Sequence, residues 1–91
     1  MNACSVPALR RGWRLQWEAA QGRHVLLYPE GMVQLNDSAG AILSLVDGER
    51  DIAEVIDELS RRYPEGAGGE LAQDVIEFFD EALRQGWIEY D

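Results

Sequence analysis

The sequence contains no lysine, one cysteine and one histidine, and each scarcity excludes a kind of chemistry. Without lysine the chain can form no Schiff base, has no P-loop lysine and offers no lysine-rich tract to nucleic acid or anionic lipid. Because Cys4 is the single cysteine, neither an internal disulfide nor a thiolate metal cluster can form. We therefore expect a reducing compartment and neither a metal nor a cofactor.

Long apolar runs are also absent. No segment approaches the roughly 20 apolar residues that a membrane span needs, and the N-terminus has no basic start followed by an apolar run of signal-peptide length. We expect a cytoplasmic protein without a membrane partner.

What the sequence does contain is sufficient for one small domain. The 91 residues are 46% hydrophobic and include three tryptophans, so they can build one modest core despite the net charge of −9. The charge is uneven, because residues 1–46 carry four Arg against three acids and residues 47–91 carry four Arg against fourteen acids. The second half of the chain therefore repels polyanions.

Three strands are predicted in the first half of the domain. Residues 13–18 alternate apolar and polar side chains, as a half-buried strand does. A Gly-containing connection leads into an apolar strand over 24–28. The sequence Pro29-Glu30-Gly31 then predicts a turn, with Pro at its first central position and a glycine available for positive φ, before a third strand over 32–35.

Three helices are predicted after the strands. Asn36-Asp37-Ser38 can cap a first, short helix. Asp51 and Glu54 have the spacing of a capping box at the start of a second helix that reaches Tyr63.

The third helix is predicted after a Gly-rich loop over 64–69. It runs from about Glu70 to Gln85 and ends at Gly86. Residues 87–90 then predict a docked tail or a short strand. We assign residues 1–8 to a flexible N-terminus and 9–91 to the domain.

No residue is a candidate for catalysis. We interpret His24 as structural or solvent-facing, because no motif places a nucleophile beside it. The acids between Asp47 and Glu58 do not follow calcium-loop spacing and are interpreted as solvated helix faces and caps.

Particular segments carry a resemblance to a known family. They are Tyr28-Pro29-Glu30-Gly31 at the turn and Leu35-Asn36-Asp37-Ser38-Ala39 at the first helix start, supported by Arg14-Leu15-Gln16 and by Asp74-Val75. On these segments the chain resembles the PqqD family, over roughly residues 9 to 90. The predicted order of elements is compatible with a winged-helix-like α+β domain, a three-stranded antiparallel sheet followed by three helices.

The resemblance implies a function and a site. PqqD proteins are non-catalytic peptide chaperones of pyrroloquinoline quinone (PQQ) biosynthesis, which bind the precursor peptide PqqA and present it to the radical-SAM enzyme PqqE. In such recognition elements the peptide adds as a β-strand along the third strand and lies in a groove closed by the third helix. The implied peptide-binding residues are Gly31, Met32, Val33, Gln34, Leu35, Leu71, Asp74, Val75, Phe78 and Phe79.

Physical reasoning supports part of this implication and leaves alternatives. An uncovered sheet edge can hydrogen-bond an extended peptide, but the tail at Trp87-Ile88 or a second copy of the chain could cover it instead. The apolar stripes of the third helix together span roughly 160°, wider than the core stripe of about 100°. Either one margin of this helix faces a groove or both stripes are buried.

Two other functions remain open. A winged-helix nucleic-acid binder is compatible with the order of elements, but the third helix carries five acids against Arg84 alone. A purely structural dimerisation module would use the same edge strand. The chain is a monomer or a homodimer, and a swapped dimer could form through the 66–69 loop or the 29–31 turn.

Overall fold

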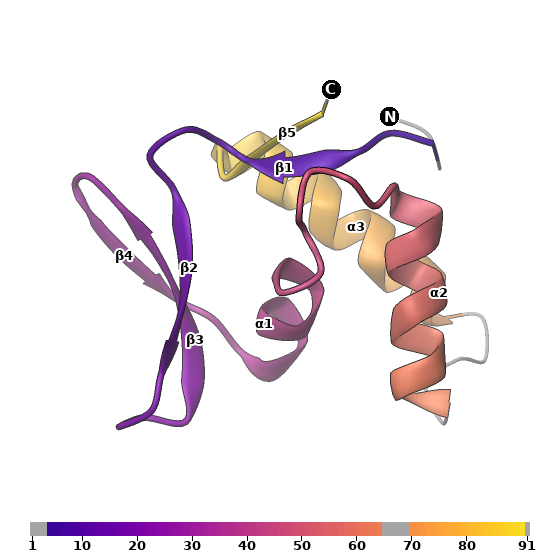
Figure 1. Cartoon of the computed structure of the whole chain (residues 1–91), viewed down its shortest axis with the longest axis horizontal. Coiled ribbons are helices and arrows are strands. Elements are labelled where there is room, and N and C mark those ends of the chain that lie inside the picture. Colours follow the sequence, from indigo (N-terminus) through magenta and orange to yellow (C-terminus); the bar gives the residue numbers. More distant parts are fainter. Residues whose placement is uncertain (1–3, 65–69, 91) are drawn as a thin grey trace.

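The computed structural model describes residues 4–64 and 70–90, which form five strands and three helices (Figure 1). The strands are β1 (Pro7–Leu9), β2 (Arg14–Glu18), β3 (Arg23–Tyr28), β4 (Gly31–Gln34) and β5 (Ile88–Tyr90). The helices are α1 (Asp37–Leu43), α2 (Ile52–Arg62) and α3 (Glu70–Gln85). The predicted three-stranded sheet followed by three helices is confirmed; the Gly-rich loop falls mainly on residues 65–69, outside the described residues.

The main sheet is antiparallel, in the order β2-β3-β4. Its register sets Leu15 opposite Leu26 and Leu26 opposite Val33, so these three side chains share the face that packs on the helices. The 29–31 turn differs from its prediction in one respect, because Gly31 is not among the residues with positive φ. Pro29 and Glu30 form the turn between β3 and β4 without a positive φ at Gly31.

A second, two-stranded sheet joins the two ends of the described chain. In this sheet β1 pairs with β5 antiparallel, with Ala8 opposite Glu89. The sequence predicted a docked tail or short strand at 87–90, and the strand is what forms, but it predicted no strand at Pro7–Leu9. Pro7 and Ala8, which the sequence assigns to a flexible N-terminus, are paired with Tyr90 and Glu89 in this strand. The sequence carries no signal for the strand, because three residues have no measurable alternation and the partner lies some eighty residues away.

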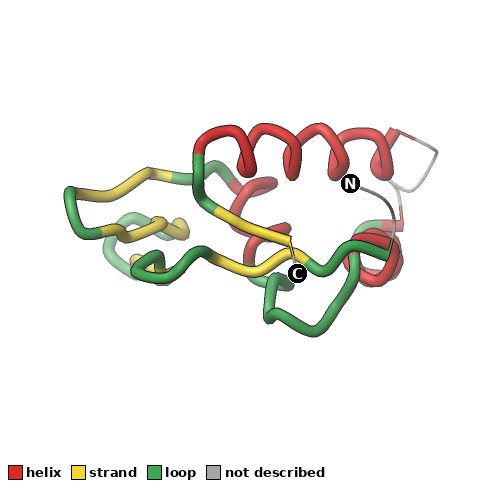
Figure 2. The backbone as a smooth tube through the Cα atoms, turned by 90° about the horizontal axis from the view of Figure 1, so that it is seen from above, coloured by secondary structure: helices red, strands yellow, loops and turns green. Residues whose placement is uncertain are grey.

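The helices lie on the same side of the main sheet, and α1 is the helix that packs directly on it (Figure 1). α1 packs on β3, and α3 packs on α2 and β5 (Figures 1 and 2). The core is apolar among the described residues and is built around Leu26, Leu43, Ile52, Val55, Val75, Phe79 and Ile88, each at most 1% exposed.

The predicted starts of α1 and α2 are confirmed by their capping hydrogen bonds, whereas α1 ends at Leu43, before the predicted stop at Asp47-Gly48-Glu49. The Oδ1 atom of Asn36 accepts from the N–H of Ala39 at 2.8 Å, which caps α1. At the start of α2, the Asp51 carboxylate accepts from the N–H of Glu54 at 2.8 Å and the Glu54 carboxylate accepts from the N–H of Asp51 at 2.9 Å, a complete capping box. Gly86 follows α3 with φ of 81°.

α1 approaches the sheet closely because it carries Gly40 where it crosses β3. A Cβ atom placed on Gly40 would lie 2.6 Å from Nδ1 and 3.1 Å from Cβ of His24. The lone histidine therefore packs beneath α1, which agrees with its interpretation as structural.

We predict that Gly40→Ala lowers the free energy of unfolding by about 1–3 kcal/mol, because the added methyl overlaps His24. Urea denaturation measures the change. Gly31→Ala is the control, since a Cβ there meets only Tyr28 at 3.5 Å or more and φ is not positive. In a His24→Ala background, which removes the 2.6 Å contact with Nδ1 but keeps the 3.1 Å contact with Cβ, Gly40→Ala should cost less. An equal cost in both backgrounds would contradict the contact with the ring.

We also predict that Tyr90→Phe stabilises the fold. The Tyr90 hydroxyl is buried and has no hydrogen-bond partner among the described residues, so removing it should add about 1 kcal/mol to the free energy of unfolding. Burial, and secondarily the charge of Asp80, raise the pKa of Tyr90 above its ordinary 10.0. The folded state therefore disfavours the phenolate, and stability should fall as the pH rises above 10.

Thermal unfolding between pH 7 and pH 11 tests both statements about Tyr90. The alkaline loss of stability should be smaller in Tyr90→Phe. Tyr63→Phe is the control, because Tyr63 is 53% exposed and should change neither quantity. A lower melting temperature for Tyr90→Phe at pH 7 would show that the hydroxyl is satisfied.

Candidate functional site

β4 forms an open edge of the main sheet. It pairs with β3 on one side, and no other strand of the described chain pairs with it on the other. The N–H of Leu35 donates to the carbonyl of His24 at 3.2 Å, which makes this a hydrogen-bonded pair of the ladder. Since such pairs alternate with non-bonded ones, the backbone N–H and C=O groups of Met32 and Gln34 point away from β3. They are available to an added strand.

A hollow of about 570 Å³ adjoins the end of β4. It is bounded by the strand end, by α1, by α3 and by the start of the C-terminal segment. Its lining residues are Gln34, Leu35, Asn36, Ser38, Ala39, Ile42, Asp74, Glu77, Phe78 and Trp87.

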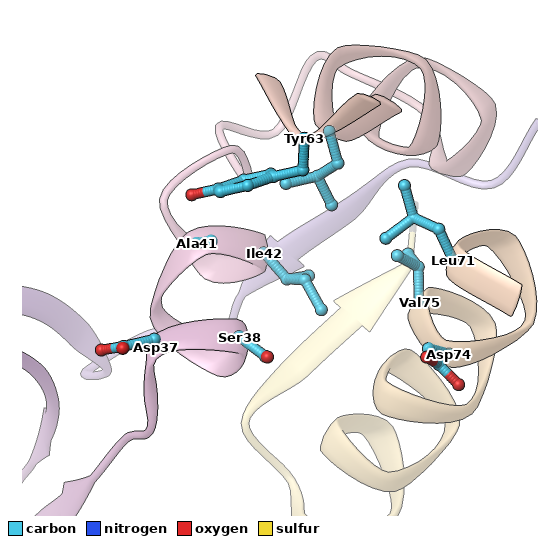
Figure 3. A pocket seen from close by; sticks show the side chains of 9 residues that line it. Asp37, Ser38, Ala41, Ile42, Tyr63, Leu71, Asp74 and Val75 are labelled. Carbon is cyan, nitrogen blue, oxygen red and sulfur yellow. The ribbon is translucent and has the colours of Figure 1, made fainter. Parts of the chain in front are cut away.

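A second hollow, of about 210 Å³, continues between the same two helices toward the end of α2 (Figure 3). Its lining residues are Asp37, Ser38, Ala41, Ile42, Leu59, Tyr63, Leu71, Asp74 and Val75. The two hollows share Ser38, Ile42 and Asp74. We call them together the α1–α3 groove.

The floor of the groove is apolar and its rim is polar. Figure 3 shows Ile42 of α1 and Leu71 and Val75 of α3 in the space between the helices, while the Asp37 carboxylate points away from them. Asp74 lies on the α3 side, and Glu77 follows it one turn along the helix. A groove of this kind suits an occupant with apolar side chains facing inward.

The structure brings together six of the ten residues that the resemblance implied. The residues that line the groove are Gln34, Leu35, Leu71, Asp74, Val75 and Phe78. Gly31, Met32 and Val33 lie before the groove on β4, where Met32 is 53% exposed and Val33 packs on the core. Phe79 lines neither hollow; it is 0% exposed and belongs to the core.

α3 has a buried stripe and a half-buried margin, and Phe78 and Phe79 lie on different ones. The central stripe of the helix, Val75, Phe79 and Ala82, is buried. Leu71 and Phe78 form a half-buried margin on the groove side. One margin of the wide apolar surface thus faces a groove, which was one of the two arrangements left open by the sequence.

Sequence reasoning missed the wall that α1 contributes. Ser38, Ala39 and Ile42 face α3 across the groove, but a seven-residue helix is too short for its apolar spacing to separate a groove side from a core side. Tyr63 and Trp87 were missed because they lie beyond the ends of their helices. The one sequence feature that could have indicated this wall is the pair of small residues Ala39 and Ala41, which comes directly after the capping sequence.

The charged side chains of the groove lining are all acidic. The groove lining includes three carboxylates and no Arg or His. Within residues 4–64 and 70–90, no group of three or more His, Cys, Asp or Glu is placed to hold a metal ion. In the same part of the chain, no helix is both long enough and apolar enough to cross a membrane.

An open strand edge beside an apolar groove is the arrangement of domains that bind an extended peptide by strand addition. Comparison with known proteins specifies the family. Residues 23–88 match the family of Coenzyme PQQ synthesis protein D, PqqD. The chain therefore belongs to the PqqD family.

Relatives and solved structures agree with this assignment. The chain is 57% identical to a PqqA binding protein of Klebsiella pneumoniae over 97% of this chain and 94% of that protein. It is 58% identical to one of Azotobacter vinelandii over 92% and 89%.

The fold is also found in experimental structures. The PqqD part of Methylobacterium extorquens PqqCD, a functional stand-alone recognition element for ribosomally synthesized and post-translationally modified peptides, superposes with a TM-score of 0.80, 29% identity and coverage of 98% and 94%. PqqD of Xanthomonas campestris gives a TM-score of 0.54 at 34% identity, with 93% of each chain covered. The α+β fold expected from the sequence is thereby confirmed.

We predict that alanine substitutions separate the two neighbouring phenylalanines. Phe79→Ala should lower the free energy of unfolding by about 3–5 kcal/mol, because it empties a fully buried site. Phe78→Ala should cost clearly less, since the groove already exposes part of that ring. Urea denaturation of both variants measures the difference, and equal losses would place Phe78 in the core as well.

Proposed function

We propose that the chain is a non-catalytic PqqA-binding protein of PQQ synthesis that acts as a peptide-recognition element. The observation that carries the proposal is the open β4 edge beside the α1–α3 groove. The relatives named above are PqqA binding proteins, and the recognition element of Methylobacterium extorquens has the same fold. The single cysteine fits a cytoplasmic location.

In the proposed complex a PqqA segment becomes the fourth strand of the main sheet. Its backbone pairs with the outward groups of Met32 and Gln34, which supply affinity without regard to sequence. Because side chains of a strand alternate, every second peptide side chain faces the α1–α3 groove and is selected there by the apolar floor of Leu35, Ile42 and Phe78.

We further propose that the complex presents PqqA to PqqE. A peptide held along β4 and α3 leaves the outer face of α2 and the solvent side of the sheet uncovered. The enzyme can therefore contact the domain while the peptide remains bound. The chain supplies binding and orientation, and the enzyme performs the chemistry.

Dimerisation through the same edge is the competing use of β4. A second copy that paired with β4 would occupy the backbone groups that PqqA needs. We propose a peptide-accepting monomer, since the adjoining groove offers side-chain pockets that pairing of two edges alone would not use.

We predict that Gln34→Pro weakens PqqA binding at least about tenfold, because the ring removes an outward N–H donor and obstructs the added strand. Met32→Pro should act alike. Val33→Pro should instead unfold the hairpin, since the N–H of Val33 points inward to β3 in this register. Calorimetric titration with synthetic PqqA gives the affinities, and thermal unfolding gives the stabilities.

Gln34→Ala is the matched control, because it removes the side chain and leaves the backbone donor; it should bind nearly as well as the unaltered chain. Size-exclusion chromatography with and without PqqA shows whether peptide and self-association compete. Unchanged affinity in a folded Gln34→Pro variant would contradict strand addition. So would amide shifts confined to residues 49–63, with 31–35 and 70–83 unmoved.

A further inference from the structure

The carboxylates on the α3 rim of the groove define what kind of peptide it accepts. Resting on the proposed function, we infer that the bound segment of PqqA places a Lys or Arg side chain against Asp74 and Glu77 while its neighbouring apolar side chains enter the groove. The lining contains no Arg or His that would neutralise these two carboxylates, and its third carboxylate, Asp37, points away from the space between the helices (Figure 3).

Position is the first argument. Asp74 lines both hollows and Glu77 lines the larger one. They are three residues apart on α3, so their carboxylates lie on one side of the helix, one turn apart. Across the larger hollow lie Gln34 and Leu35 of the open edge. A strand added to β4 must therefore pass between that edge and these two acids.

Charge pairing is the second argument. The acids that form ion pairs in the described part of the chain are Asp47, Asp57, Glu58 and Glu81, none of which lines the groove. Asp74 has no ion pair there, and Glu77 accepts only from the neutral amide of Gln73, at 3.2 Å. A peptide lying over the groove would partly desolvate both carboxylates, which is unfavourable unless it brings a cation.

The apolar surroundings favour a long basic side chain in particular. Phe78 lies beside Glu77 and is half-buried in the wall of the groove. Lys and Arg can lay their aliphatic stems on such a surface and keep the charged end at the rim. The groove thus selects an extended peptide segment that contains both apolar residues and a basic residue. The basic residue would lie near the end of β4, opposite Asp74 and Glu77.

Isosteric neutralisation tests the inference. Asp74→Asn with Glu77→Gln should weaken binding of synthetic PqqA about 3- to 10-fold at low salt, and should remove most of the salt dependence of the affinity. Asp80→Asn with Glu81→Gln is the matched control, with the same change of charge on the same helix outside the groove lining. It should bind as the unaltered chain does.

The peptide supplies the complementary half of the experiment. Each Lys or Arg of PqqA is replaced in turn by norleucine. One of these replacements should weaken binding to the unaltered chain. The same replacement should not further weaken binding to the variant with Asp74→Asn and Glu77→Gln. The same position changed to Glu should bind better to a variant with Asp74→Lys and Glu77→Lys than to the unaltered chain.

Outcomes for the inference and for the proposed function are distinct. If PqqA still shifts the amides of β4 and α3 but binds the neutralised variant within twofold of normal at low salt, the inference is wrong and the peptide site stands. A contact segment without Lys or Arg would likewise overturn the inference. If PqqA leaves β4 and α3 unmoved, the proposed function itself fails.

Discussion

The antiparallel pairing of β1 with β5 determines where α3 lies and therefore whether a groove exists. The N–H of Arg10 donates to the carbonyl of Trp87 at 3.0 Å, and the N–H of Trp87 donates to the carbonyl of Ala82 at 2.9 Å. These two hydrogen bonds fix the position of the chain directly after the end of α3. Ile88 is buried in the core. With its end secured, α3 lies across from α1, and the C-terminal residues are paired with β1 and not with β4.

The open edge of β4 is a consequence of that arrangement. A tail of three residues could have completed the main sheet, but its hydrogen bonds are used in the small sheet. Close packing of α1, which Gly40 permits above His24, brings Ser38, Ala39 and Ile42 up to the strand end. Backbone groups that can pair and side-chain pockets that can discriminate thus lie side by side, as a peptide-recognition domain requires.

Charge restricts the partner that this geometry can serve. α3 is the helix that a winged-helix nucleic-acid binder would place in a groove, yet it presents Asp74 and Glu77 along the rim of the α1–α3 groove and lacks the clustered cations that phosphate binding needs. Its apolar margin at Leu71 and Phe78 remains accessible beside these acids. The combination favours a peptide with apolar and basic side chains over a polyanion.

Much of the fold follows from interactions between residues close in sequence. The alternation over 13–18, the turn before β4, the capping box of Asp51 and Glu54 and the stop at Gly86 each depend on neighbours within a few positions, so they could be predicted. Two of these short segments, Arg14-Leu15-Gln16 and the turn at Tyr28-Pro29-Glu30-Gly31, are also among those that carried the resemblance to the PqqD family, which the comparisons confirm.

Only the tertiary structure decided which of these elements meet. The pairing of Pro7–Leu9 with Ile88–Tyr90 joins residues from opposite ends of the chain, and three-residue strands leave no periodic signal. Phe78 and Phe79 are adjacent and chemically identical, yet one lines the groove and the other fills the core, because the position of α1 and β5 around α3 sets the two sides of that helix. Local sequence specifies which residues are apolar, whereas long-range packing determines which apolar residues remain for a partner.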